Sequence, residues 1–124
     1  MKEHKILVVD DDSSIRRLLS YLLEKAGYSV ITADDGIEAL ARIESAKPEV
    51  VITDLMMGKL DGYELCRSIR ARREYDAMKI IVLTARDQTS DTEVLKASGV
   101  DSVMKKPINP QELTKTVRGF LEQQ

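Results

Sequence analysis

The sequence contains one cysteine, one histidine, one phenylalanine and no tryptophan in 124 residues. The single cysteine, Cys66, excludes an internal disulfide and a cysteine-based zinc site, and it fits a reducing compartment. The single histidine, His4, lies in a charged amino-terminal tail, where we expect a surface residue with no role. A metal site in this chain would therefore have to use oxygen ligands.

The sequence also lacks a large excess of positive or negative charge, and it has no long apolar run. Lys and Arg total 19 against 21 Asp and Glu, a balance that gives no electrostatic footprint for nucleic acid or for an anionic membrane. The opening residues, MKEHKILVV, hold too short an apolar core for a signal peptide, and no segment reaches transmembrane length. We therefore expect a soluble, cytoplasmic protein that contacts neither nucleic acid nor a membrane directly.

Short apolar runs without polar alternation predict strands buried on both faces, as in a parallel sheet covered by helices. The expected strands are Ile6–Val9, Ser29–Ala33, Val50–Thr53, Ile80–Leu83 and Asp101–Lys105. The last of these is the most polar, which indicates the edge of the sheet. Four of the five are followed at once by residues that can carry chemistry.

Apolar residues at helical spacing follow each strand, and they predict five helices. The residues that define four of these patterns are Ile15, Leu18, Leu19, Leu22 and Leu23; Ile37, Leu40 and Ala41; Leu65, Cys66 and Ile69; and Leu113, Val117, Phe120 and Leu121. A weaker pattern runs from about Ser90 to Ser98. Asp12 or Ser13 can cap the first helix, which Gly27 closes, and Asn109 can cap the last.

Alternating strands and helices predict an α/β fold: a doubly wound five-stranded parallel sheet, order 2-1-3-4-5, with five helices. We expect one domain over residues 1–124, because there is no linker, repeat or low-complexity tract. No residues remain for a second domain, so the chain either stands alone or is cut from something longer.

Acidic residues follow the first and third strands. Asp10 and Asp11 come directly after the first strand, and Asp54 follows the third. These strands are neighbours in the expected order, so their carboxyl ends bring the three side chains together. Converging carboxylates repel unless a cation compensates them, and Mg²⁺ suits a site with few protein oxygens and room for water.

A hydroxyl and an ammonium follow the last two strands. Thr84 comes after the fourth strand and Lys106 after the fifth, so both should lie over the same crevice. A carboxylate nucleophile, a metal ion, a hydroxyl and a lysine form a site for phosphoryl transfer, with Asp54 attacking in line while Mg²⁺ and Lys106 neutralise charge. We interpret Asp12 as a helix cap and Lys105 as a solvated side chain.

Four motifs in this order resemble a bacterial two-component response-regulator receiver domain of the chemotaxis-type, single-domain kind: VVDDDSSIRRLL, VVITDLMMGKLDGYEL, IIVLTAR and KKPINPQEL. The resemblance covers essentially the whole chain. It implies that Asp54 is the phosphoaccepting residue and that Asp11, with Asp10 beside it, binds the metal. It further implies that Met56 binds the metal through its backbone carbonyl, that Thr84 is the switch hydroxyl, and that Lys106 is joined to Pro107 by a cis bond.

The resemblance also implies a function. The chain would take a phosphoryl group from a sensor histidine kinase or a histidine phosphotransfer protein, and would then change its surface toward a downstream target or an output domain. It would be a self-catalysed phosphoacceptor rather than a turnover enzyme. We expect slow self-dephosphorylation, because Met56 and Arg86, two residues beyond Asp54 and Thr84, offer no general base. Whether phosphorylation causes dimerisation stays open.

Two other functions are considered. A receiver-like interaction module that works without phosphorylation is disfavoured, because every residue of the acidic pocket is present. A Mg²⁺-dependent phosphohydrolase is disfavoured because Met56 stands where a second acid would be needed.

Three departures from the family pattern affect signal transmission rather than chemistry. Gly58 stands where proline is frequent, Val103 where tyrosine or phenylalanine is frequent, and Ile108 where phenylalanine is frequent.

Overall fold

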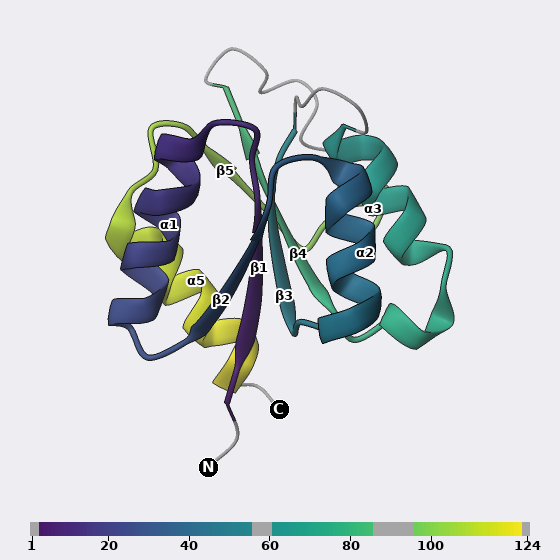
Figure 1. The fold of residues 1–124 in the computed structure, drawn as a ribbon, viewed down its shortest axis with the longest axis horizontal. Coiled ribbons are helices and arrows are strands. Elements are labelled where there is room, and N and C mark those ends of the chain that lie inside the picture. Colours follow the sequence, from purple (N-terminus) through teal and green to yellow (C-terminus); the bar gives the residue numbers. More distant parts are fainter. Residues whose placement is uncertain (1–2, 56–60, 86–95, 123–124) are drawn as a thin grey trace.

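The five strands form one parallel sheet in the order β2-β1-β3-β4-β5, which confirms the predicted order (Figure 1). The computed structural model describes residues 3–55, 61–85 and 96–122. The strands are β1 (Lys5–Val9), β2 (Ser29–Ala33), β3 (Val50–Asp54), β4 (Lys79–Thr84) and β5 (Ser102–Lys105). Each lies within one residue of its predicted bounds at either end, and β5 is an edge strand as its polarity indicated.

The described residues contain four α-helices and one short 3₁₀ helix. They are α1 (Ser13–Lys25), α2 (Gly36–Ala46), α3 (Gly62–Arg70), η1 (Arg73–Tyr75) and α5 (Pro110–Glu122). Of the fifth expected helix, from about Ser90 to Ser98, residues 90–95 lie outside the described residues, and the described Lys96 and Ala97 are helical. The helix count is therefore borne out for four of the five helices, and the labels follow Figure 1.

Polar side chains start the helices where the sequence places them. Asp12, Asp35 and Asp61 have extended backbones and each accepts a hydrogen bond from a backbone N–H two or three residues later, at 2.8–2.9 Å. Asn109 does the same for α5, at 3.0 and 3.1 Å. These bonds satisfy N–H groups that lack a partner within the helix. Asp12 and Asp35 come within three residues of the ends of β1 and β2, so these two caps fix where the chain turns at that edge of the sheet.

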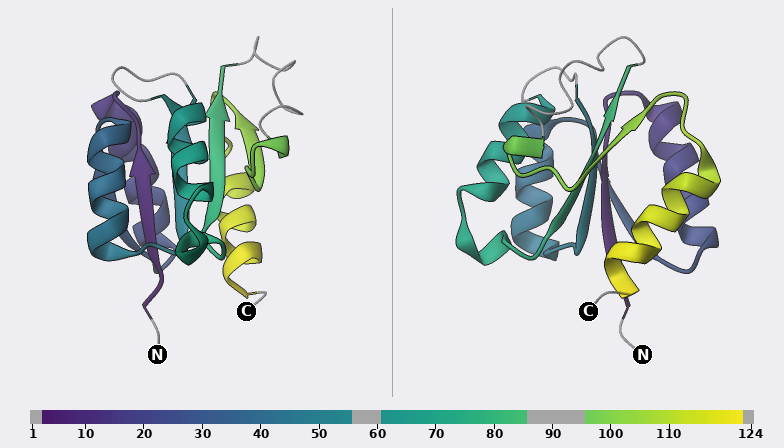
Figure 2. Two further views of the ribbon diagram at one scale, coloured as in Figure 1. Left: turned by 90° about the vertical axis from the view of Figure 1, so that its right-hand side faces the viewer. Right: turned by 180° about the vertical axis from the view of Figure 1, so that it is seen from behind.

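The helices cover both faces of the sheet. Helices α2 and α3 lie on one face, and α1 and α5 lie side by side on the other (Figures 1 and 2). Two apolar clusters fill the space between sheet and helices, and residues of β1, β3 and β4 alternate between the two clusters. The central strands are therefore buried on both faces, which holds their carboxyl ends rigidly.

Two residues that the sequence assigns to apolar helix faces are exposed in the structure. Leu18 is 44% exposed and Ile37 is 59% exposed. Helix α2 instead buries Gly36, Ala39 and Ile43, a stripe with helical spacing that leaves Ile37 one position off the face. An apolar residue next to the buried stripe thus points to solvent, which the sequence pattern alone did not separate.

His4 makes side-chain contacts that the sequence did not predict. Its ring is half-buried, with Nδ1 2.9 Å from Glu49 Oε1, and it contacts Tyr28 edge-on. His4 therefore joins the amino-terminal end of the sheet to the start of β3.

None of the helices in the described part of the chain combines the length and the apolar character needed to span a bilayer.

Candidate functional site

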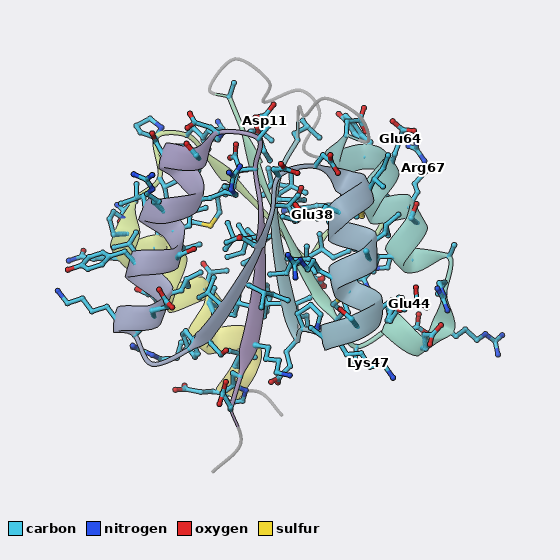
Figure 3. The ribbon with its side chains drawn as sticks, in the orientation of Figure 1. Asp11, Glu38, Glu44, Lys47, Glu64 and Arg67 are labelled. Carbon is cyan, nitrogen blue, oxygen red and sulfur yellow. The ribbon has the colours of Figure 1, made fainter. Side chains whose placement is uncertain are left out.

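Three carboxylates meet at the edge of the sheet where the strands end. Asp10 follows β1, Asp54 ends β3, and β1 pairs with β3 through Val9 and Thr53. One carboxylate oxygen from each of Asp10, Asp11 and Asp54 lies within 4.8 Å of the others. Asp10 is fully buried, Asp54 is half-buried, and Asp11 is exposed at the end of the sheet (Figure 3). The predicted convergence of these three residues is therefore present.

Lys106 brings a positive charge to the same place. Its Nζ lies 3.3 Å from Asp10 Oδ2 and 3.3 Å from Asp54 Oδ1. Its backbone N–H donates to Thr84 O at 2.8 Å, so the end of β4 positions the residue. The Lys106–Pro107 bond is cis, as the resemblance implied.

The charges of the site are unbalanced. Burial raises the pKa of the Asp54 carboxyl above its ordinary value; the Lys106 ammonium opposes this, and the carboxylates of Asp10 and Asp11 add to it. Burial opposes the charge on Lys106, but the carboxylates of Asp54 and Asp10 outweigh burial and raise its pKa. Lys106 therefore stays protonated, while its single charge does not compensate three carboxylates.

Asp10 is held from four directions. Its Oδ1 accepts from Asp12 N at 2.9 Å, its Oδ2 faces Lys106, and its backbone N–H donates to Ala33 O at 3.2 Å. The fourth contact comes from α1, where Arg16 Nη1 donates to Asp10 O at 2.6 Å. Sequence reasoning missed Arg16, because a main-chain carbonyl partner leaves no trace in the pattern of residue types.

The backbone that carries Asp54 is packed tightly. Leu55 N donates to Leu83 O at 2.9 Å, and Gly62 N donates to Leu55 O at 2.8 Å. A Cβ atom at Gly62 would lie 2.7 Å from Asp54 O and 2.8 Å from Leu55 Cα, closer than real Cβ contacts. Gly62 is thus required by the close approach of the α3 start to the end of β3.

The remaining predicted residues fall in different positions. Thr84 ends β4 beside β3 and is 1% exposed, but no hydrogen bond joins its hydroxyl to Asp54 within the described ranges. Lys105 is exposed, and Asp12 is a helix cap, as expected. Met56, Gly58 and Arg86 lie outside the described residues. The structure therefore brings together Asp10, Asp11, Asp54 and Lys106, with Thr84 adjacent.

The donor set fits a hard divalent cation. Both carboxylate oxygens of Asp10 already have protein partners, whereas Asp11 has none among the residues the structure describes. Asp11 and Asp54 therefore offer free carboxylate oxygens next to an uncompensated negative charge. Few carboxylates and an open, solvent-facing side are what Mg²⁺ prefers, because it keeps part of its water shell.

Comparison with known proteins gives a consistent result. The family model described as "Response regulator receiver domain" matches residues 6–118. The Bacillus subtilis "Alkaline phosphatase synthesis transcriptional regulatory protein PhoP" is 44% identical over 117 residues, which are 94% of this chain and 48% of that protein. The "Response regulator MprA" of Mycobacterium avium is 43% identical over 94% of this chain and 50% of its own length. The chain thus spans about half the length of these relatives.

Solved structures of similar length match the whole fold. A crystal structure of a putative response regulator from Chloroflexus aurantiacus has a TM-score of 0.92 and 35% identity, covering 98% of this chain and 99% of the other. The chemotaxis response regulator CheY4 of Vibrio cholerae has a TM-score of 0.89 and 37% identity, covering 96% and 99%. Similarity therefore extends to solved chains of about the same length as well as to longer regulators.

Proposed function

Because the chain belongs to the family of response regulator receiver domains, the phosphorylation-controlled switches of two-component systems, we propose that it accepts a phosphoryl group on Asp54. The observation that carries the proposal is the position of Asp54. Its carboxylate lies beside Asp10 and Asp11 on a rigid strand end, with the Lys106 ammonium 3.3 Å away. This arrangement combines a nucleophile with groups that can offset the charge of a phosphoryl group.

In the proposed reaction, an Asp54 carboxylate oxygen forms a bond to phosphorus as the P–N bond of a phosphohistidine breaks. The imidazole nitrogen keeps the electron pair of that bond and takes up a proton. Lys106 orients Asp54 and places positive charge next to the transferred oxygens, while Asp10 holds Lys106 in place. Mg²⁺, held by Asp11 and Asp54 and by the proposed backbone carbonyl of Met56, would supply further charge neutralisation.

The output of the site is proposed to pass through Thr84. Its backbone carbonyl already binds Lys106 N, so movement of Thr84 toward new phosphoryl oxygens would act on the turn after β5. Val103, on the neighbouring strand, is half-buried and packs against the apolar cluster that lies between the sheet and helices α2 and α3. It has no aromatic ring to exchange between exposed and buried rotamers, so we propose that it contributes little to the switch.

The wider role is also a proposal. We propose that residues 1–124 form one receiver domain that acts in the cytoplasm, with a sensor histidine kinase or a histidine phosphotransfer protein as donor. The relatives that are named transcriptional regulators are about twice as long as this chain. Their names favour a downstream target or an output domain outside these residues, and a phosphorylation-dependent dimer is one form that this output could take.

Intact-mass analysis after incubation with acetyl phosphate tests the proposal. The native protein with Mg²⁺ should gain the mass of one phosphate, and the gain should vanish with EDTA and in Asp54→Asn. Asp76→Asn is the matched control, because Asp76 is exposed and remote from the acidic cluster. A mass gain that persists in Asp54→Asn would contradict the assignment. No gain in the native protein under any condition would favour the alternative, an interaction module that works without phosphorylation.

A further inference from the structure

The side chain of Arg16 binds a main-chain carbonyl of the acidic loop. It lies in the first turns of α1, and its Nη1 donates to the backbone carbonyl of Asp10 at 2.6 Å. Its own backbone N–H donates to Asp12 O at 3.1 Å. Within the described ranges, no carboxylate lies within salt-bridge distance of the guanidinium. The charge of Arg16 is therefore directed at the main chain of the loop that carries the acidic residues.

The contact fixes the orientation of one particular peptide. The peptide unit is planar, so the carbonyl oxygen of Asp10 lies in one plane with the N–H and Cα of Asp11. A donor that holds this oxygen therefore determines where the Asp11 side chain begins. Arg16 holds it with a cationic guanidinium, which forms a strong charge-assisted bond to the carbonyl.

Asp11 depends on this contact more than Asp10 does. Asp10 is buried, and three further contacts position its carboxylate and its N–H. The carboxylate of Asp11 is exposed and has no hydrogen-bond or ion-pair partner in the described part of the chain. No side-chain partner in the described part of the chain fixes its direction, so its approach to Asp54 depends on the backbone, one end of which is bound by Arg16.

We propose that Arg16 is a positioning residue for the metal ion: it orients the Asp10–Asp11 peptide so that the Asp11 carboxylate faces Asp54. This inference rests on the proposed function, because it assumes that Mg²⁺ binds at the acidic cluster. Arg16 does not touch the metal or the phosphoryl group. It acts through Asp11, as groups behind a metal ligand commonly do.

The neighbouring arginine offers a matched control. Arg17 is on the same helix and is exposed, and the structure gives it no hydrogen bond to the loop. Arg16→Met keeps the length of the side chain and removes the donor, Arg16→Lys keeps a charge and a donor but loses the planar fork, and Arg17→Met removes a charge from the same helix. The three variants separate the loss of the contact from a general loss of positive charge.

The test measures Mg²⁺ binding to the unphosphorylated proteins by calorimetry with MgCl₂ alone. Arg16→Met should raise the Mg²⁺ dissociation constant about tenfold, and Arg16→Lys should raise it by a smaller factor. The dissociation constant of Arg17→Met should stay within about twofold of the native value. In phosphorylation by acetyl phosphate, the half-saturating Mg²⁺ concentration should rise by the same factor in Arg16→Met. The rate at saturating Mg²⁺ should stay close to native, because Asp54 and Lys106 are untouched.

The outcomes distinguish this inference from the function on which it rests. A lower melting temperature of Arg16→Met with an unchanged Mg²⁺ dissociation constant would show a purely structural role and overturn the inference alone. Native protein that binds no Mg²⁺ would overturn both the inference and the proposed function. If Arg16→Met does not fold, Arg16→Lys decides: a native dissociation constant in this variant, together with a changed Asp11 amide chemical shift, would also overturn the inference.

Discussion

Gly62 lies so close to Asp54 that a Cβ atom on Gly62 would stand 2.7 Å from the Asp54 carbonyl oxygen. The start of α3 and the end of β3 are therefore in direct backbone contact. Any side chain at this position would have to displace the strand end that carries the proposed phosphoacceptor. The glycine links the stability of the fold to the geometry of the site.

Gly62→Ala should therefore lower the free energy of unfolding by about 1–3 kcal/mol, the usual cost of overpacking. It should also slow phosphorylation by acetyl phosphate, because the Asp54 carboxylate would move relative to Lys106. Gly119→Ala is the control: Gly119 is in α5 with nothing within 4 Å of the new Cβ, and alanine should stabilise this helix by about 0.5–1 kcal/mol. Urea unfolding of both variants measures the difference; equal effects would contradict the steric argument.

Asp54→Asn should stabilise the metal-free protein at neutral pH. Burial raises the pKa of Asp54 in the folded state, so the folded protein binds more protons than the unfolded chain between the ordinary and the raised pKa. Stability attributable to this group is thus present at low pH and is lost as the pH rises through that interval. Asparagine has no proton to lose and stays neutral, so the difference in unfolding free energy between variant and native protein should grow with pH.

The measurement is urea unfolding of native protein, Asp54→Asn and the exposed-site control Asp76→Asn in EDTA, from about pH 4 to pH 7. Adding Mg²⁺ should stabilise the native protein and reduce the difference, since the cation compensates the Asp54 charge. If Asp54→Asn were less stable than native protein throughout this range without Mg²⁺, the unbalanced charge inferred for the site would be wrong.

Arg70 joins three chain segments through one guanidinium. It donates to the carbonyls of Tyr75, Met78 and Gly99 at 3.1, 2.8 and 2.9 Å, and to Asp101 Oδ2 at 2.9 Å. The side chain is only 20% exposed. These bonds tie the end of α3 to η1, to the start of β4 and to the turn before β5.

Arg70→Met should lower the free energy of unfolding by about 2–4 kcal/mol, because the Asp101 carboxylate loses its guanidinium partner and the carbonyls of Met78 and Gly99 lose a donor. Arg67→Met, one turn earlier on the outer side of α3, should change it by less than about 0.5 kcal/mol (Figure 3). Chemical denaturation compares the two. Similar losses in both variants would mean that the bonds of Arg70 add nothing specific to the fold.

Thr84→Ala should reduce the response of the protein to beryllofluoride and Mg²⁺, whereas Val103→Ala should leave it largely intact. Thr84 adjoins the site through β4 and its carbonyl binds Lys106 N. Val103 is half-buried and too small to change place as a ring would. Amide chemical shifts of residues 96–106 measure the response. A full response in Thr84→Ala would show that the signal leaves the domain by another route.

The sheet and the acidic cluster could be predicted because both follow from local patterns. Unbroken apolar runs fixed the strands, and the strand order then placed Asp10 beside Asp54. The exposure of Leu18 and Ile37 could not be predicted in the same way, since a helix has apolar positions beside its buried stripe. Their orientation depends on how each helix sits on the sheet.

Contacts of long side chains with distant main-chain atoms also escaped prediction. Arg16 binds the Asp10 carbonyl, and Arg70 binds three carbonyls and a carboxylate 31 residues away in the chain. A carbonyl is present at every position, so the sequence does not single out the one that accepts. His4 and Glu49, 45 residues apart, pair for a reason that only the strand order reveals.

The most direct test of the account is to locate the phosphoryl group. Borohydride reduces an aspartyl phosphate to homoserine, and peptide mass spectrometry can place that residue in the sequence. After treatment with acetyl phosphate and Mg²⁺, the account predicts homoserine at position 54 alone, and none when EDTA replaces Mg²⁺. Homoserine at position 10 or 11, or a modified Asp54 in the absence of Mg²⁺, would contradict it.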